Sequence, residues 1–542
     1  MARTPVMHAL RRLAAEHAAA TRLALPAAEV RGSTRRELLG RAAALGLGTA
    51  LASSATAYAA EALPDKRKRV TPARVAVVGA GISGLTAALT LQDAGVACTL
   101  YEANPGRVGG RMWTQRDHWA HGQASEIGGE LIDTSHKKIL ALCRRFGLRT
   151  EDFLGGGPIG AEEVLWFNGE YYPRHQADED FKAVFQRLHR DLQEAGEVSW
   201  NSTTPTGTAL DNMTIYEWIE TRVPGGHGSQ LGRFIDVAYN VEYGADTDQQ
   251  SALALVLLMG YQPNPGHFNV WGLSNERYHI AGGNDQLPNA IAAALPAGCL
   301  VMGRELVAVR ANADGTQTLT FNDSGAIRTA TADHTILCLP LPVLQRVDTA
   351  GAGFDPLMRN LLRDARMGHC TKLNMQFTAR PWRGTGAWPG VSAGDCFTDS
   401  DVQQTWDTTK VQPGTGGILL QYAGGSLAAS LAPATPFATE SDPYVRGLAD
   451  RMLTGIDAFY PGTKAVWNGR AQLSAWHRSP YSLGAYSYWP TGYLHRYAKY
   501  EGTAQGNIHI GGEHTSYDFQ GFMEGGATEG ERAAREVITA LT

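Results

Sequence analysis

A glycine-rich turn set between two short strand patterns constrains the fold of this chain more than any other feature. Residues 74–78 (RVAVV) form a β-branched run typical of a buried parallel strand, and they lead directly into residues 79–84 (GAGISG). A helical pattern follows over residues 85–91, and residues 96–101 predict a second strand, which is followed by Glu102. This order of strand, turn, helix, strand and acid predicts a parallel α/β sheet that binds a dinucleotide.

Each glycine of the turn has its own expected role. We expect Gly79 to form the tight turn, Gly81 to let the backbone approach a pyrophosphate, and Gly84 to let the helix pack closely on the strand. The N-terminus of that helix then binds the anion. Glu102 lies where an acid bonds a ribose hydroxyl, and its charge would repel a 2′-phosphate, so NADP is disfavoured.

A second glycine-rich segment, residues 106–114 (GRVGGRMWT), favours FAD over NAD. It contains Gly110 and Arg111, and the guanidinium of Arg111 supplies a fixed cation for a phosphate bound near the first helix. NAD-binding proteins have no need of this segment. FAD is long enough to run from the ribose site past Arg111 toward a ring bound elsewhere.

Composition and charge exclude several other classes of protein. The chain has 542 residues, 43% of them hydrophobic, which is enough for two or more packed units. Its 48 Lys and Arg against 53 Asp and Glu give a net charge of −5 without a basic stripe, so nucleic acid is not an expected partner. The six cysteines form no C-x-x-C pair, no metal site is predicted, and no stable membrane insertion is expected after the N-terminal segment.

Five further segments carry a resemblance to a known family. They are residues 127–130 (IGGE), 282–287 (GGNDQL), 333–340 (DHTILCLP), 508–515 (IHIGGEHT) and 521–535 (GFMEGGATEGERAAR). Together with the two glycine-rich segments, they resemble the flavin-containing amine oxidase superfamily, which includes monoamine oxidases, polyamine oxidases and L-amino-acid oxidases. The stretches that would face the substrate match least.

The resemblance implies an α/β fold with two interleaved domains. A Rossmann-like FAD-binding domain with a parallel sheet would comprise residues 72–150, 271–345 and 466–542. An α+β substrate-binding domain would comprise residues 151–270, which read as helix-rich, and residues 346–465, which alternate strand-like runs with polar loops.

The resemblance also implies how FAD is bound. Gly128 and Gly129 would pass beside the flavin ring, Val307 would lie on a strand against the adenine, and Glu513 would bond the ribityl-phosphate end. The backbone at Met523, which opens the last helix, would face the pyrimidine oxygen, where the helix dipole favours negative charge. The expected cofactor-binding residues are Gly79, Gly81, Gly84, Glu102, Gly110, Arg111, Gly128, Gly129, Val307, Gly512, Glu513 and Met523.

The expected chemistry belongs to the flavin, because no Ser-His-Asp group, glycosidase carboxylate pair or HExxH motif is visible. Lys372 matches the family lysine that holds a water against flavin N5; its alternative role is that of an outward-facing lysine on an edge strand. Phe522, Trp476 and Tyr486 match aromatic positions near the ring, although core packing is the ordinary role of an aromatic. Ala485 stands where monoamine oxidases carry the cysteine that bonds the flavin, so the FAD should be non-covalent.

The expected reaction is oxidative deamination, in which an amine loses hydride from its α-carbon to flavin N5, the imine is hydrolysed and O₂ reoxidises the flavin to give hydrogen peroxide. We expect an L-α-amino acid as the substrate. However, many L-amino-acid oxidases follow the Glu-x-Gly segment with a Met-Arg pair whose arginine binds the carboxylate. Here the segment continues with residues 130–133 (ELID), and that arginine is missing. Arg277, Lys372 or His514 would have to replace that arginine, whereas Glu130 could attract a basic group.

Three alternatives stay open at this point. The substrate could be a monoamine or polyamine, the electron acceptor could be a carrier protein as in a flavin amine dehydrogenase, or the chain could be a flavin-binding partner without catalysis. A homodimer is one of the assemblies that the sequence allows.

The N-terminal segment predicts export. Residues 34–39 (TRRELL) are a twin-arginine pattern, followed by the weakly apolar residues 42–51 and by a small-x-small cleavage site at residues 57–59. We therefore expect a Tat-type signal over residues 1–59, a polar linker over 60–71 and a periplasmic or extracellular protein. The alternative is an amphipathic N-terminal helix.

Overall fold

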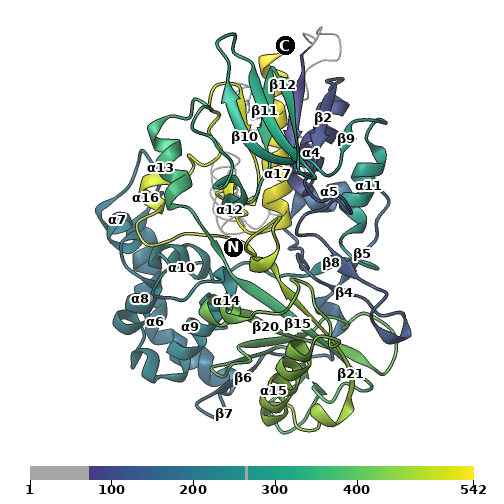
Figure 1. Ribbon diagram of the computed structural model, residues 1–542. Coiled ribbons are helices and arrows are strands. Elements are labelled where there is room, and N and C mark those ends of the chain that lie inside the picture. The colour runs from purple at the N-terminus through teal and green to yellow at the C-terminus, as the bar shows by residue number, and fades with distance from the viewer. Residues whose placement is uncertain (1–72, 263–265) are drawn as a thin grey trace, which may run out of the picture.

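The computed structural model describes residues 73–262 and 266–542 of the chain. The predicted signal and linker lie outside these residues. Figure 1 shows two parts: an upper one around the purple strand β2 and the yellow helix α17, and a lower one around strands β15 and β20.

The upper part is built on a five-stranded parallel sheet with the order β23-β13-β1-β2-β9. Its strands come from three separated stretches of the chain, as the resemblance implied. They are β1 (Val75–Val78), β2 (Cys98–Tyr101), β9 (Leu300–Val301), β13 (His334–Leu337) and β23 (Ile508–Ile510).

Two helices pack against each other on this sheet, and small residues allow their close approach (Figure 1). They are α4 (Ile82–Asp93) and α17 (Met523–Ala540). A Cβ on Gly530 of α17 would lie 2.0 Å from the carbonyl oxygen of Ser83 in α4, so only glycine fits there. The packing brings the N-termini of both helices to the same region of the protein.

A three-stranded antiparallel sheet adjoins the parallel sheet. It comprises β10 (Glu305–Ala311), β11 (Gln317–Asp323) and β12 (Ala326–Ala332). Helix α5 (Lys137–Arg145) packs on α17, and α11 (Gln286–Ala294) packs on α4. The chain also forms the short helices α12 (Leu341–Leu344), α13 (Pro356–Asp364) and α16 (Leu494–Tyr497).

The lower part is built on a seven-stranded mixed sheet with the order β21-β15-β20-β19-β18-β6-β7. Its central strands β15 (Cys370–Phe377) and β20 (Gly417–Gly424) are antiparallel and buried. The remaining strands are β6 (Val164–Phe167), β7 (Glu170–Tyr171), β18 (Cys396–Thr398), β19 (Gln404–Asp407) and β21 (Trp467–Ala475). Strand β21 falls within the third stretch assigned to the FAD domain, yet it pairs with β15 of this sheet.

Helices cover the lower sheet. A helical group lies to the left in Figure 1 and consists of α6 (Arg174–Ala195), α7 (Pro205–Asp211), α8 (Ile215–Arg222), α9 (Gln230–Tyr243) and α10 (Ala252–Met259). Helices α14 (Gly425–Ser430) and α15 (Pro443–Phe459) adjoin the strands. The predicted architecture, a parallel-sheet domain interleaved with an α+β domain, is confirmed. Within the described residues, no helix has the length and apolar character needed to cross a membrane.

Candidate active site

A cavity of about 630 Å³ runs between the two parts of the protein. Both glycine-rich segments and the start of α17 line one end of it, and residues of α9, β15 and β20 line the other. The cavity therefore connects the predicted dinucleotide site with the predicted substrate domain.

The first glycine run has the geometry that its three roles require. Gly79 has φ +97, and a Cβ there would lie 2.7 Å from the carbonyl oxygen of Cys338. A Cβ on Gly84 would lie 1.9 Å from the carbonyl oxygen of Gly79, so helix and turn touch. Gly81 lines the cavity, and a Cβ there would meet no protein atom within 4 Å. A side chain at Gly81 would thus occupy the space that a pyrophosphate needs.

Glu102 is held at this end of the cavity by backbone donors. Its Oε2 accepts the N–H of Ala80 at 2.7 Å, and its Oε1 accepts the N–H of Asn104 at 2.7 Å. Burial raises the pKa of this carboxyl, and the two N–H donors and the nearby charge of Arg107 act against that rise. Glu102 lines the cavity and can accept a ribose hydroxyl there.

The second glycine-rich segment lies against the first. A Cβ on Gly110 would lie 3.3 Å from the Cα of Gly81. The Nη1 of Arg111 donates to Glu513 Oε1 at 2.9 Å and to the carbonyl oxygen of Ala485 at 2.7 Å. Burial alone would raise the pKa of Glu513, but the charge of Arg111 and the Ser487 hydroxyl hold it below its usual value.

Four further predicted residues lie on the same wall. Gly128 and Gly129 line the cavity, and a Cβ on Gly129 would lie 3.1 Å from the side chain of Met523. Met523 and Gly512 line it too, and Met523 is the first residue of α17, so the N-terminus of that helix faces the cavity. These donors and glycine-lined cradles fit an FAD molecule that extends from Glu102 to the start of α17.

Val307 is not among the residues that line the cavity, although its neighbours Arg304, Glu305 and Leu306 are. The carbonyl oxygen of Val307 accepts the N–H of Asp348 at 2.9 Å. The register of β10 shifts immediately after Leu306, which displaces Val307 from the regular ladder. Strand β10 thus reaches the cavity wall through Leu306, and the contact of Val307 with the adenine stays a prediction.

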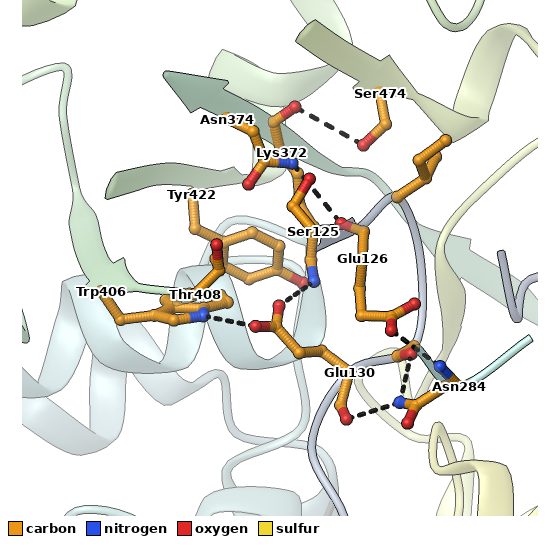
Figure 2. A network of polar contacts seen from close by, with 12 residues as sticks. Ser125, Glu126, Glu130, Asn284, Lys372, Asn374, Trp406, Thr408, Tyr422 and Ser474 are labelled. Carbon is orange, nitrogen blue, oxygen red and sulfur yellow. Dashed lines mark hydrogen bonds and ion pairs between the residues drawn. The ribbon is translucent and has the colours of Figure 1, made fainter. Parts of the chain in front are cut away.

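Lys372 forms a buried ion pair with Glu130, as Figure 2 shows. The Nζ of Lys372 lies 2.6 Å from Glu130 Oε2, and Trp406 Nε1 donates to Glu130 Oε1 at 3.2 Å. The two charged side chains are only 8% and 3% exposed. Because β15 pairs with β20 on one side and β21 on the other, Lys372 does not lie on an edge strand.

The main chain of Glu130 is fixed by Asn284. Asn284 Nδ2 donates to the carbonyl oxygens of Gly129 at 3.0 Å and Glu130 at 2.6 Å (Figure 2). The backbone N–H of Asn284 donates to Glu126 Oε1 at 2.8 Å. Burial, with the nearby charge of Glu130, raises the pKa of Glu126 to about 8. The GGND segment thus orients the Glu130 side of the ion pair.

The predicted aromatic residues Trp476, Tyr486 and Phe522 all line the cavity. The hydroxyl of Tyr486 lies 2.7 Å from that of Tyr422 and donates to the carbonyl oxygen of Val241 at 2.9 Å. Two aromatic side chains that the sequence analysis missed, Trp406 and Tyr422, complete the wall beside Lys372.

Two carboxylates that the sequence analysis missed, Glu242 and Glu276, also line the cavity. Glu276 has φ +42, a left-handed conformation that is costly for a non-glycine residue. Asp133 Oδ1 holds it there by accepting the Glu276 N–H at 2.7 Å. Burial, with the charges of Glu242 and Asp133, raises the pKa of Glu276 to about 8. The sequence gives no sign of Glu242, because helix α9 also carries the charged residues Arg233 and Asp236.

Among the residues that the structure describes, the lysine and arginine side chains on the substrate side of the cavity are paired with acids. Besides Lys372, the cavity is lined there by Lys410, which lies 2.7 Å from Asp395, and by Arg174, which lies 2.8 Å from Glu163.

The remaining residues considered for a carboxylate site supply no free cation to the cavity. Arg277 bonds Asp152 at 2.6 Å and is 43% exposed. Burial lowers the pKa of His514 to about 4, so its ring is neutral near pH 7.

The fold and this cavity fit a flavin-dependent oxidoreductase whose cofactor site opens into a substrate chamber. The family described as flavin containing amine oxidoreductase matches residues 82–538, and the chain belongs to this family.

Individual relatives differ in what they act on. A flavin-containing amine oxidase of Danio rerio is 24% identical over 86% of this chain and 86% of its own length. An L-amino-acid oxidase of Mus musculus is 26% identical over 85% of this chain and 70% of its own length. A putrescine oxidase bound to putrescine has the same fold, with a TM-score of 0.71, 20% sequence identity, and coverage of 86% of this chain and 99% of its own.

Proposed function

We propose that this protein is an FAD-dependent oxidase of an amine that carries a second positive charge. When bound, the flavin accepts a hydride from the α-carbon of the amine and passes the electrons to O₂, which gives hydrogen peroxide. The observation that carries the proposal is the Glu276 carboxyl group, which lines the substrate chamber, whereas Lys372, Lys410 and Arg174 are already paired with acids.

The chain's own residues prepare the amine for this reaction. The aromatic side chains of Tyr486, Phe522 and Trp406 exclude water and pack against the carbon chain of the substrate. The Lys372–Glu130 ion pair adds almost no net charge to the chamber. The ammonium group of Lys372 has two further N–H groups that do not point at Glu130, and these can hold a water beside the reacting carbon. The Glu276 carboxylate attracts the distal ammonium and so orients the carbon chain of the substrate.

Four compounds form a matched test of this proposal. 1,5-Diaminopentane and L-lysine differ only by a carboxylate, as do n-pentylamine and L-norleucine, and the two pairs differ from each other by the terminal ammonium. We expect the highest kcat/KM with 1,5-diaminopentane and a loss of about 10- to 100-fold on removal of the second ammonium, because a charge-assisted contact contributes about 1.5–3 kcal/mol. Equal kcat/KM values for n-pentylamine and 1,5-diaminopentane would contradict the proposal.

The L-α-amino acid expected from the sequence is the second candidate, and the relationship to the mouse L-amino-acid oxidase favours it. To bind the carboxylate of an amino-acid substrate, Lys372 would have to break its ion pair with Glu130 and form one with the substrate. In the four-compound test, this candidate predicts that L-norleucine exceeds n-pentylamine.

Three further parts of the proposal concern the surroundings of the enzyme. Oxygen is the proposed electron acceptor. If the reduced flavin is reoxidised in air as fast as the enzyme turns over, this supports oxygen over a carrier protein. Non-covalent FAD is proposed because Ala485 has no sulfur. Export is proposed from the twin-arginine pattern at residues 34–39, and the N-terminal mass of the secreted protein tests it.

A further inference from the structure

Two cysteine thiols lie together on the edge of the parallel sheet, away from the Lys372 region. The sulfurs of Cys98 and Cys299 are 3.8 Å apart, and neither forms a disulfide. Cys98 begins β2, and Cys299 directly precedes β9, the last strand of the sheet. The backbone holds this pairing, because the N–H of Leu100 donates to the carbonyl oxygen of Cys299 at 2.7 Å.

The pair is chemically asymmetric. Cys299 is 8% exposed, whereas Cys98 is only half-buried and so offers a route for a small oxidant. The hydrogen bond between the sulfurs lowers the pKa of the Cys299 thiol to about 7, because the neighbouring thiol stabilises its thiolate. A thiolate next to a second thiol is the arrangement that reacts with a peroxide and then closes to a disulfide.

We propose that Cys98 and Cys299 are a modification site at which hydrogen peroxide forms a disulfide that ties strand β9 to strand β2. The Cys299 thiolate attacks one peroxide oxygen, the O–O bond breaks, and with one proton from solution the first water leaves. The Cys98 thiol then attacks the resulting sulfenic acid, the S–S bond forms, and a second water leaves. Two thiols are oxidised by two electrons, and one peroxide is reduced to two waters.

The disulfide would act on the cofactor end of the cavity. Strand β9 joins β2 through only two residue pairs, Leu100 with Leu300 and Tyr101 with Val301. The N–H of Glu102 donates to the carbonyl oxygen of Val301 at 2.9 Å, and β9 continues into Arg304, which lines the cavity. A covalent link at the start of this ladder therefore stabilises the wall that holds Glu102.

The test uses the full protein, purified with its flavin under reducing conditions and then treated with one equivalent of hydrogen peroxide. Adding the peroxide directly makes the test independent of the proposed amine oxidation. We expect the number of titratable thiols in the denatured protein to fall from six to four. Peptide mass mapping should show one cross-linked species that contains residues 98 and 299, with a mass two hydrogens below the sum of the two separate peptides. FAD release on dilution should slow about threefold or more, and dithiothreitol should reverse every change.

Cys143 provides a matched control, because it is a free buried thiol in the same apolar cluster. Cys143→Ala should keep the cross-link. Cys98→Ala should lose the cross-link, and Cys299 should react more slowly with peroxide because the hydrogen bond that stabilises its thiolate is gone. Cys98→Ser, the second variant, keeps a hydroxyl that can donate to the Cys299 sulfur, so it should lose the cross-link and accumulate oxygen on Cys299. Wild-type protein that retains all six thiols, or that collects oxygen on Cys299 without a cross-link, would overturn the proposal. A cross-link that leaves the FAD release rate unchanged would overturn its role at the cofactor site.

Discussion

Replacing Lys372 by methionine tests the role of the buried ion pair most sharply. The substitution keeps the length and apolar stem of the side chain and removes the ammonium that lies 2.6 Å from Glu130 Oε2. Loss of a preorganised charge in an enclosed site costs about 2–4 kcal/mol, which corresponds to roughly 30- to 1000-fold in the half-reaction that uses it. Stopped-flow spectroscopy separates anaerobic bleaching of the flavin by substrate from its reoxidation by O₂.

The same substitution also affects folding, and this effect must be separated from catalysis. Lys372→Met leaves the Glu130 carboxylate buried beside Trp406 without its cation, which costs about 3–5 kcal/mol of stability. The double variant Lys372→Met/Glu130→Gln removes both charges, so we expect it to recover most of that stability. We expect no recovery of the slowed half-reaction.

The comparison of the single and double variants can refute this reasoning. If both half-reactions of Lys372→Met stay within twofold of wild type, the ammonium has no part in the chemistry. If the double variant regains the wild-type rates, the single variant was slow only because an unpaired carboxylate distorted the cavity.

Four further substitutions or treatments have distinct expected outcomes. Gly81→Val should fold with the wild-type far-UV circular dichroism but lose FAD, because its side chain meets no protein atom and fills the pyrophosphate cradle; full FAD occupancy would contradict this. Glu102→Ala should weaken FAD binding by about 0.5–1.5 kcal/mol for each hydrogen bond that is lost, as measured by flavin fluorescence after dilution. Acid precipitation should release intact FAD into the supernatant, and colour retained in the pellet would reveal a covalent bond despite Ala485. With 1,5-diaminopentane, kcat/KM should rise as the pH increases through about 8, because the Glu276 carboxyl group loses its proton there. Glu276→Gln should abolish this rise. The same substitution should leave the pH profile of kcat/KM for n-pentylamine unchanged.

The sequence predicted the dinucleotide end of the protein well because its determinants are local. The positive φ of Gly79 and the contact between Gly84 and the turn depend on residues within one strand–turn–helix unit. The shift in strand register between Leu306 and Ala308 is not visible in the residue pattern, so the sequence could not predict how the backbone runs at Val307.

The substrate chamber could not be predicted in the same way. The partner of Lys372 is 242 residues away in the sequence, and no periodicity relates the two. Glu276 enters the cavity because Asp133, far from it in the chain, holds its backbone in a left-handed conformation. Such sites arise from tertiary contacts, so individual acids in a sequence give little sign of them.

The most direct test of the central claim is the flavin spectrum of the purified protein mixed anaerobically with 1,5-diaminopentane. The account predicts bleaching of the yellow absorbance at concentrations of the diamine well below those of L-norleucine, and return of the colour with formation of hydrogen peroxide when air is admitted. A spectrum unchanged by 1,5-diaminopentane, together with full bleaching by L-norleucine, would show that the chamber binds a carboxylate and contradict the account.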